Sequence, residues 1–271
     1  MSDASPVELH VEDSGGDGRP VVLIHGWPLS GAAWKHQVGP LRDAGFRVIS
    51  YDRRGFGRSD KPNGGYDYDT LAADLAGLIE ERDLSDVTLV GFSMGGGEVA
   101  RYVANHGDER LASVVFAAAV PPYLMKTEDN PDGPLTKAAA EQMEASLRAD
   151  RTTFFDGFAR GFFSADGVLK VSEEELASAI VLCHQSSQTA ALGCMKAFGT
   201  TDFREDLKSV TVPTLVLHGD SDAIVPLEGS GALTNKAIAG SRLVVLEGAP
   251  HGCNVSHAAD FNEALLDFLR G

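Results

Sequence analysis

The chain has 271 residues, 43% of them hydrophobic, and is long enough to bury one sizeable α/β core together with an insertion. Its formal net charge is −16, spread along the sequence, which argues against nucleic acid or an anionic membrane as a partner. The odd number of cysteines argues against a disulfide framework, and no apolar stretch reaches the ~18 residues of a membrane span.

Strand-like and helix-like segments alternate along the chain. Residues 1–6 have neither the basic start nor the apolar core of a signal peptide, so we expect a cytoplasmic protein. Residues 7–12 alternate apolar and polar side chains, which is typical of an exposed edge strand. The alternation that follows predicts an α/β fold with a mostly parallel sheet and helices on both faces. The expected core strands are 21–24, 46–51, 87–90, 113–118, 215–218 and 243–246, and the expected helices are 31–44, 68–82, 96–105, 226–239 and 256–269.

The first core strand is followed by His25-Gly26-Trp27-Pro28. Gly26 allows the backbone to approach a site at the end of the strand closely. Trp27 keeps its backbone N–H, whereas Pro28 has none, so Trp27 is the better donor to the oxygen of a reacting carbonyl group. Its ring is expected to form a wall of the pocket. We expect His25 to make a structural hydrogen bond and not to act as a second base.

The second core strand ends in Asp52-Arg53-Arg54-Gly55-Phe56-Gly57-Arg58-Ser59-Asp60, a loop that mixes charges and glycines. The loop lacks the G-x-x-x-x-G-K-[ST] pattern of a phosphate-binding loop. We therefore expect its arginines to form structural salt bridges around a nearby nucleophile.

Gly91-Phe92-Ser93-Met94-Gly95 is a G-x-S-x-G sequence between a β-branched, apolar strand and a helix. A sharp turn from strand to helix exposes the serine hydroxyl, and the flanking glycines remove the Cβ clashes that would forbid the turn. Ser93 is therefore the predicted nucleophile, and the N–H of Met94 is the second predicted oxyanion donor. The plainer alternative is a glycine-rich turn with an incidental serine.

The strand pattern stops over residues 121–206. Pro121-Pro122 interrupts the chain, and the segments 138–149 and 173–184 read as helices. Phenylalanines cluster between them at largely helical spacing, which is typical of packing between a cap and a core, and about two of them are expected to face substrate. We interpret 121–206 as a helical cap inserted into an α/β-hydrolase core formed by 1–120 and 207–271.

Two further polar residues follow late strands. Asp222 lies just beyond strand 215–218 and His251 beyond strand 243–246, which completes the chain order Ser…Asp…His of α/β-hydrolases. We predict that Asp222 orients His251 and that His251 acts as the general base. Asp220 is the alternative acid, although a turn role suits it better. His218 closes a strand and is expected to be packed.

Three segments, residues 25–30, 51–60 and 91–99, resemble those of the cofactor-free bacterial haloperoxidases, also called non-haem chloroperoxidases or perhydrolases. This branch of the α/β-hydrolase superfamily also includes aryl esterases and some γ-lactamases. The resemblance runs from about residue 7 to the C-terminus and is weakest in the middle third. G-x-S-x-G alone would indicate only the superfamily, and the longer segments narrow it to this branch.

Carried over residue by residue, the resemblance implies the same triad, Ser93, Asp222 and His251, and the same oxyanion donors, Trp27 and Met94. It also implies an acyl pocket with aromatic and branched side chains, and for this pocket we choose Phe158, Phe162, Phe198, Ile224 and Val225. A proline at the position of Pro28 accompanies perhydrolase activity in the family, whereas relatives that favour ester hydrolysis can carry leucine. Pro28 is therefore included among the pocket residues.

The function that the resemblance implies is a serine esterase acting on short-chain esters through an acyl-enzyme. Water would release an acid, and hydrogen peroxide would release a peracid that oxidises halide away from the site. We expect no metal and no cofactor, and no Cys/His cluster has metal-ligand spacing. The expected partners are a small ester or short carboxylic acid and hydrogen peroxide, with a homo-oligomer as a further expectation. A lactonase or γ-lactamase with the same triad, or a ligand-binding receptor on the same fold, remains the alternative.

Overall fold

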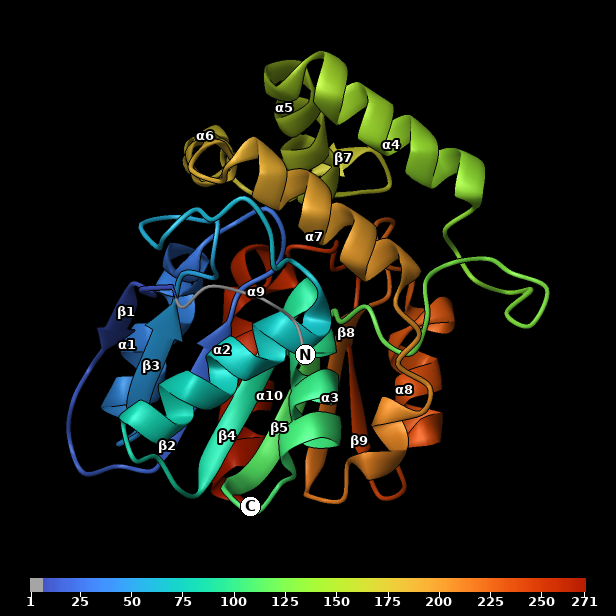
Figure 1. The fold of residues 1–271 in the computed structure, drawn as a ribbon. Helices are drawn as coiled ribbons and strands as arrows, with labels where there is room; N and C mark the ends of the chain where they lie inside the picture. The colour runs from blue at the N-terminus through green and yellow to red at the C-terminus, as the bar shows by residue number, and fades with distance from the viewer. Residues whose placement is uncertain (1–6) are drawn as a thin grey trace.

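The computed structural model describes residues 7–271, so the expectation of no signal peptide at residues 1–6 lies outside the described residues. A seven-stranded sheet in the order β1-β3-β2-β4-β5-β8-β9 lies between two helical layers (Figure 1). The pairs of neighbouring strands are parallel, apart from β1 with β3, which confirms the α/β-hydrolase prediction. The strands are β1 (Val11–Asp13), β2 (Pro20–Ile24), β3 (Arg47–Tyr51), β4 (Val87–Phe92), β5 (Leu111–Ala117), β8 (Thr214–Gly219) and β9 (Arg242–Leu246).

Helices cover both faces of the sheet (Figure 1). On one face, α1 (Lys35–Asp43) contacts α10 (Ala258–Arg270), and on the other, α2 (Tyr68–Glu81) packs along α3 (Met94–His106). The shorter α8 (Gly231–Ala237) packs beside β8 and β9. Because both faces are covered, every residue of the central strand β4 is buried, as expected of a parallel sheet.

Four further helices lie together above one end of the sheet (Figure 1). Each begins at a Ser, Thr or Asp whose side chain accepts a backbone N–H bond in the first turn, the standard N-cap of a helix. The sequence predicted two of them clearly, and its phenylalanine cluster falls on a third. The helices are α4 (Lys137–Ala149), α5 (Arg151–Phe162), α6 (Glu173–His184) and α7 (Gln188–Thr200), with a small hairpin, β6 (Ser164–Ala165) and β7 (Val168–Leu169), after α5.

Several predicted elements differ from the observed ones. The edge strand expected over 7–12 is the shorter β1, because residues 8 and 10 bond with the loop after β3 instead: the N–H of His10 donates to Ser59 Oγ at 2.7 Å. The helix expected over 31–44 starts as a 3₁₀ turn, Gly31–Trp34. The range 226–239, expected to be one helix, contains the 3₁₀ turn Leu227–Gly229 followed by α8. The helix expected over 256–269 is observed as α10, and the short α9 (Cys253–Ser256) precedes it, separated by the non-helical His257.

Within residues 7–271, none of the helices combines the length and the apolar character needed to cross a bilayer.

Candidate active site

Ser93 occupies the sharp turn between β4 and α3. Its backbone has φ 54° and ψ −118°, a left-handed conformation that is costly for a residue with a side chain. The two glycines of the motif are required by close approach, since a Cβ at Gly91 would lie 2.5 Å from the oxygen of Gly95, and a Cβ at Gly95 would lie 2.5 Å from the oxygen of Ile24. The N–H of Ser93 donates to the oxygen of Ala117 at 2.8 Å, which fixes the turn to the neighbouring strand.

Asp222, His251 and Ser93 form one hydrogen-bonded line, although they come from three separate loops. His251 Nδ1 lies 2.6 Å from Asp222 Oδ2, and His251 Nε2 lies 2.9 Å from Ser93 Oγ. All three side chains are buried, with Ser93 6% exposed. The distances are those of a nucleophile bonded to its base and of a base bonded to its orienting acid.

The carboxylate of Asp222 is held on both oxygens. Its Oδ1 accepts the backbone N–H groups of Ile224 at 2.9 Å and Val225 at 2.8 Å. Burial alone would raise its pKa, but attraction to His251 and hydrogen bonds from His218 and His251 outweigh burial and hold the pKa of Asp222 well below its usual range. The site therefore contains an ionised acceptor at a fixed position beside the imidazole.

His218 contacts the predicted triad acid, whereas Asp220 does not. His218 is fully buried, as predicted, but its Nε2 also lies 3.2 Å from Asp222 Oδ2 and donates to the oxygen of Val225 at 2.8 Å. Nothing in the sequence indicates this second contact beyond a histidine four residues before the acid. Asp220 is exposed and accepts the N–H of Gly248 at 2.7 Å, so it is a turn residue with no bond to His251 among the hydrogen bonds of residues 7–271.

The two predicted oxyanion donors lie next to the nucleophile. Met94 is the first residue of α3, and its oxygen accepts the hydroxyl of Tyr68 at 3.1 Å. Gly26, the residue before Trp27, packs closely against the turn at Ser93, because a Cβ at Gly26 would lie 3.1 Å from Ser93 Cβ. The indole N–H of Trp27 is used elsewhere, on the oxygen of Ala191 at 3.0 Å. Of the two N–H groups of Trp27, only the backbone N–H is then available to a carbonyl oxygen of the substrate.

A cavity of about 120 Å³ reaches Ser93. Of the predicted pocket residues, Phe158, Phe198, Ile224 and Val225 line it, together with Trp27. Pro28 and Phe162 are not among its lining residues; the ring of Phe162 packs edge-on against His251 with centroids 4.8 Å apart. The lining residues that the sequence did not indicate are Val120, Leu124, Pro134, Leu135, Met143, Ala223 and Pro226.

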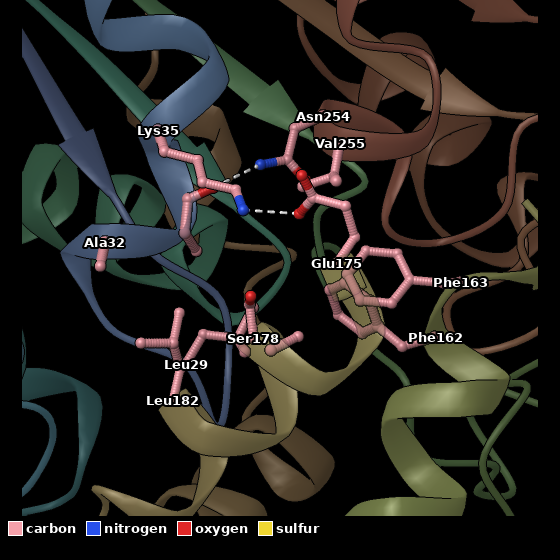
Figure 2. A pocket seen from close by; sticks show the side chains of 12 residues that line it. Leu29, Ala32, Lys35, Phe162, Phe163, Glu175, Ser178, Leu182, Asn254 and Val255 are labelled. Atoms are coloured by element: carbon pink, nitrogen blue, oxygen red, sulfur yellow. Dashed lines mark hydrogen bonds and ion pairs between the residues drawn. The ribbon is translucent and has the colours of Figure 1, made fainter. Parts of the chain in front are cut away.

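A second cavity, of about 270 Å³, lies where α6 meets the turn before α1 (Figure 2). Its lining is mainly apolar and includes Leu29 and Phe162, while the ion pair of Lys35 with Glu175, 2.6 Å apart, and Asn254 supply polar groups. Ser93 does not line this cavity. The two cavities thus have no lining residue in common.

No group of three or more His, Cys, Asp or Glu side chains within residues 7–271 is arranged to hold a metal ion. The three cysteines of that range are buried and unpaired. Burial raises the pKa of Cys183 and of Cys194 to about 12, and that of Cys253 further. They are therefore protonated thiols at neutral pH and poor nucleophiles.

Comparison with known proteins gives one consistent family. Residues 19–258 match the family described as the alpha/beta hydrolase fold. The non-heme chloroperoxidase CPO-A1 of Kitasatospora aureofaciens is 43% identical over 97% of this chain and 96% of its own length, and the bifunctional esterase/perhydrolase DCH of Acinetobacter calcoaceticus is 37% identical over 97% and 96%. The crystal structure of bromoperoxidase from Bacillus anthracis has a TM-score of 0.96 and 52% identity, covering 98% of this chain and 97% of that one. The chain therefore belongs to the α/β-hydrolase family of enzymes, in the branch of the non-heme haloperoxidases and esterase/perhydrolases.

Proposed function

We propose that this protein hydrolyses short-chain carboxylic esters through an acyl-Ser93 intermediate and also forms peracids from short carboxylic acids and hydrogen peroxide. The observation that carries the proposal is the line of hydrogen bonds from Asp222 through His251 to Ser93, which ends at an apolar cavity. The esterase/perhydrolase name of the Acinetobacter calcoaceticus relative supports the same pair of reactions.

In the proposed acylation step, Ser93 Oγ attacks the ester carbonyl carbon while His251 Nε2 takes its proton. Asp222 stays ionised and stabilises the imidazolium that forms. The backbone N–H groups of Trp27 and Met94 receive the oxyanion, and one such donor typically lowers the barrier by roughly 3–4 kcal/mol. His251 then protonates the leaving alkoxide, and the acyl group remains on Ser93.

In the second step, His251 removes a proton from the incoming nucleophile, which attacks the acyl-Ser93 carbonyl. Water yields the carboxylic acid, and hydrogen peroxide yields the peracid; either attack restores the Ser93 hydroxyl when the oxyanion collapses. With a carboxylic acid as the acyl donor, the leaving group of acylation is water, so the sum is acid plus peroxide to peracid plus water. The peracid would oxidise bromide or chloride in solution, without a halide site on the protein.

The small apolar cavity favours short acyl groups such as acetyl, because about 120 Å³ leaves little room beyond a few carbons. In this proposal residues 121–206 act as a cap: Phe158 of α5 and Phe198 of α7 contact the ring of Trp27, with centroids 5.0 and 5.5 Å apart, and so help to form the cavity wall. The cytoplasmic location and a homo-oligomeric state stay predictions from the sequence.

Turnover of p-nitrophenyl acetate together with stoichiometric labelling by a fluorophosphonate tests the proposal. We expect both, and we also expect peracid when acetic acid and hydrogen peroxide are supplied. A ligand-binding receptor on this fold would show neither labelling nor turnover. A lactonase or γ-lactamase would be labelled but would turn over its cyclic substrate far better than any open-chain ester.

A further inference from the structure

Each of the three segments that carry the family resemblance contributes a polar residue to one buried network that the proposed mechanism does not use. His25 follows β2, Arg53 lies in the loop after β3, and Glu98 lies on α3. The exposed fractions of these three residues are 1%, 1% and 0%, and Tyr51, at the end of β3, is 2% exposed. A buried network of this kind is costly unless its members are hydrogen-bonded to one another.

Arg53 is the centre of the network. Its guanidinium forms an ion pair with Glu98 and donates from Nη2 to the backbone oxygen of His25 at 2.6 Å. The backbone N–H of Arg53 donates to His25 Nε2 at 3.0 Å, and this fixes the tautomer in which His25 Nδ1–H donates to the oxygen of Gly26 at 2.9 Å. The hydroxyl of Tyr51 donates to the second oxygen of Glu98 at 2.8 Å.

The network connects the two peptides that are proposed to receive the oxyanion. His25 and Gly26 directly precede Trp27, and both carbonyl oxygens of that pair are bonded within the network. Glu98 lies one helical turn after Met94 on the same helix. Arg53 therefore spans the gap between the loop that carries the first donor and the helix that carries the second.

A buried ion pair is weak support for stability, because the cost of removing both charges from water offsets much of their attraction. Burial raises the pKa of Glu98, whereas Arg53 beside it favours the carboxylate. Burial opposes the charge of Arg53 as well, but the attraction and hydrogen bond of Glu98, together with its other neighbours, outweigh burial and raise the pKa of Arg53, so the arginine remains charged. What the pair supplies directly is a rigid, directional link between two backbone segments.

We propose that Arg53 and Glu98, with His25, are positioning residues that set the separation of the Trp27 and Met94 N–H groups. This inference rests on the proposed function. It predicts that the network acts on the transition state more than on substrate binding, because an oxyanion hole contributes only where the negative charge develops.

The test uses two variants and a matched control. Glu98→Gln removes the charge and keeps the shape, and the double variant Arg53→Met, Glu98→Met replaces the ion pair with apolar side chains that can leave the stability nearly unchanged. The control is Asp74→Asn, which breaks the ion pair of the neighbouring buried Arg54 with α2 and removes no hydrogen bond of His25, Arg53 or Glu98. For each protein, kcat and KM on p-nitrophenyl acetate, the affinity for a short alkylboronic acid, and the melting temperature are measured.

We expect both network variants to lose about 10- to 100-fold in kcat with KM nearly unchanged, and to bind the boronic acid correspondingly more weakly, since its tetrahedral Ser93 adduct mimics the oxyanion. Asp74→Asn should keep both values within about twofold of wild type, whatever its melting temperature. The double variant contradicts the inference if it melts lower but keeps wild-type kcat and boronate affinity, because the network is then structural only.

If the stronger variants do not fold, Tyr51→Phe decides, because it removes one hydrogen bond to Glu98 and leaves the ion pair in place. Its kcat and boronate affinity should then fall together by a smaller factor, and unchanged values would overturn the inference. Wild-type protein without Ser93-dependent turnover would instead refute the proposed function. The two failures are therefore distinct.

Discussion

His251 Nε2 lies 2.9 Å from Ser93 Oγ, across 158 positions of the sequence, and the ring of Phe162 packs edge-on against the same imidazole. The proposed base is thus hydrogen-bonded on both nitrogens and packed against an aromatic ring. With only 1% of His251 exposed, water has little access to it from outside the cavity. His251 is therefore held in position before any substrate binds, which is what its proposed role as a general base requires.

Asp222→Asn should lower kcat on p-nitrophenyl acetate by several orders of magnitude, on the order of 10⁴-fold, because an amide cannot stabilise the imidazolium or hold the same tautomer. Asp220→Asn is the matched control, since Asp220 lies two residues away and bonds the N–H of Gly248 instead of His251. A larger loss in Asp220→Asn than in Asp222→Asn would show that the wrong carboxylate has been assigned.

The low pKa of Asp222 also predicts a dependence of stability on pH. A carboxylate whose pKa is lower in the folded than in the unfolded protein stabilises the fold above its ordinary pKa of 3.8, and this contribution is lost as the pH falls toward the folded pKa. The free energy of unfolding, measured by urea titration, should therefore fall between about pH 5 and pH 3. The fall should be shallower in Asp222→Asn, and equal slopes in the two proteins would contradict the account.

Pro28→Leu should lower the ratio of peracid formation to ester hydrolysis several-fold. Proline fixes its own φ and restricts the residue before it, so it holds the carbonyl group of Trp27 in one orientation beside the acyl-enzyme. There that oxygen can accept a hydrogen bond from the second O–H of hydrogen peroxide. The ratio is measured with acetic acid and peroxide against p-nitrophenyl acetate. An unchanged ratio would leave Pro28 with a purely structural role, in agreement with its absence from the cavity lining.

The cavity makes a prediction about acyl-chain length. Phe198→Ala should raise kcat/KM for p-nitrophenyl hexanoate relative to the acetate, because it removes a ring that lines the cavity at Ser93. Phe154→Ala is the control: its ring also packs against Trp27, with centroids 6.2 Å apart, but it does not line the cavity. A similar change of preference in both variants would mean that Trp27 moves, and that Phe198 does not itself limit the chain length.

The positions of the three triad residues could be predicted because each follows a strand, and strands are marked by local apolar runs. The sharp turn at Ser93 was also predictable, since the G-x-S-x-G pattern marks it and the need for Gly91 comes from Gly95, four residues later. The need for Gly95 was not visible in the same way, because it comes from Ile24 of β2. The bond between His218 and Asp222 was not, because it depends on how the loop after β8 folds back.

Residues 121–206, the proposed cap, were the least predictable part of the site. Helix α7 has no strong apolar stripe, and its start at Ser187 is a capping signal that many loops share. Phe158 and Phe162 lie one turn apart on α5, yet only Phe158 lines the cavity at Ser93, while Phe162 faces His251 and the second cavity. The rotation of α5 about its own axis decides between them, and that rotation is set by tertiary packing, which the spacing of the phenylalanines does not reveal.

In the proposed reaction, Ser93 carries the acyl group. The acyl group can be located if the protein is mixed with p-nitrophenyl acetate at low pH, quenched within the first turnovers, digested and analysed by mass spectrometry. We predict one acetyl group per chain on the peptide containing Ser93, and none in Ser93→Ala, which should fold normally and lose almost all turnover. An acetyl group on another residue, or turnover in Ser93→Ala above a few per cent of wild type, would contradict the account.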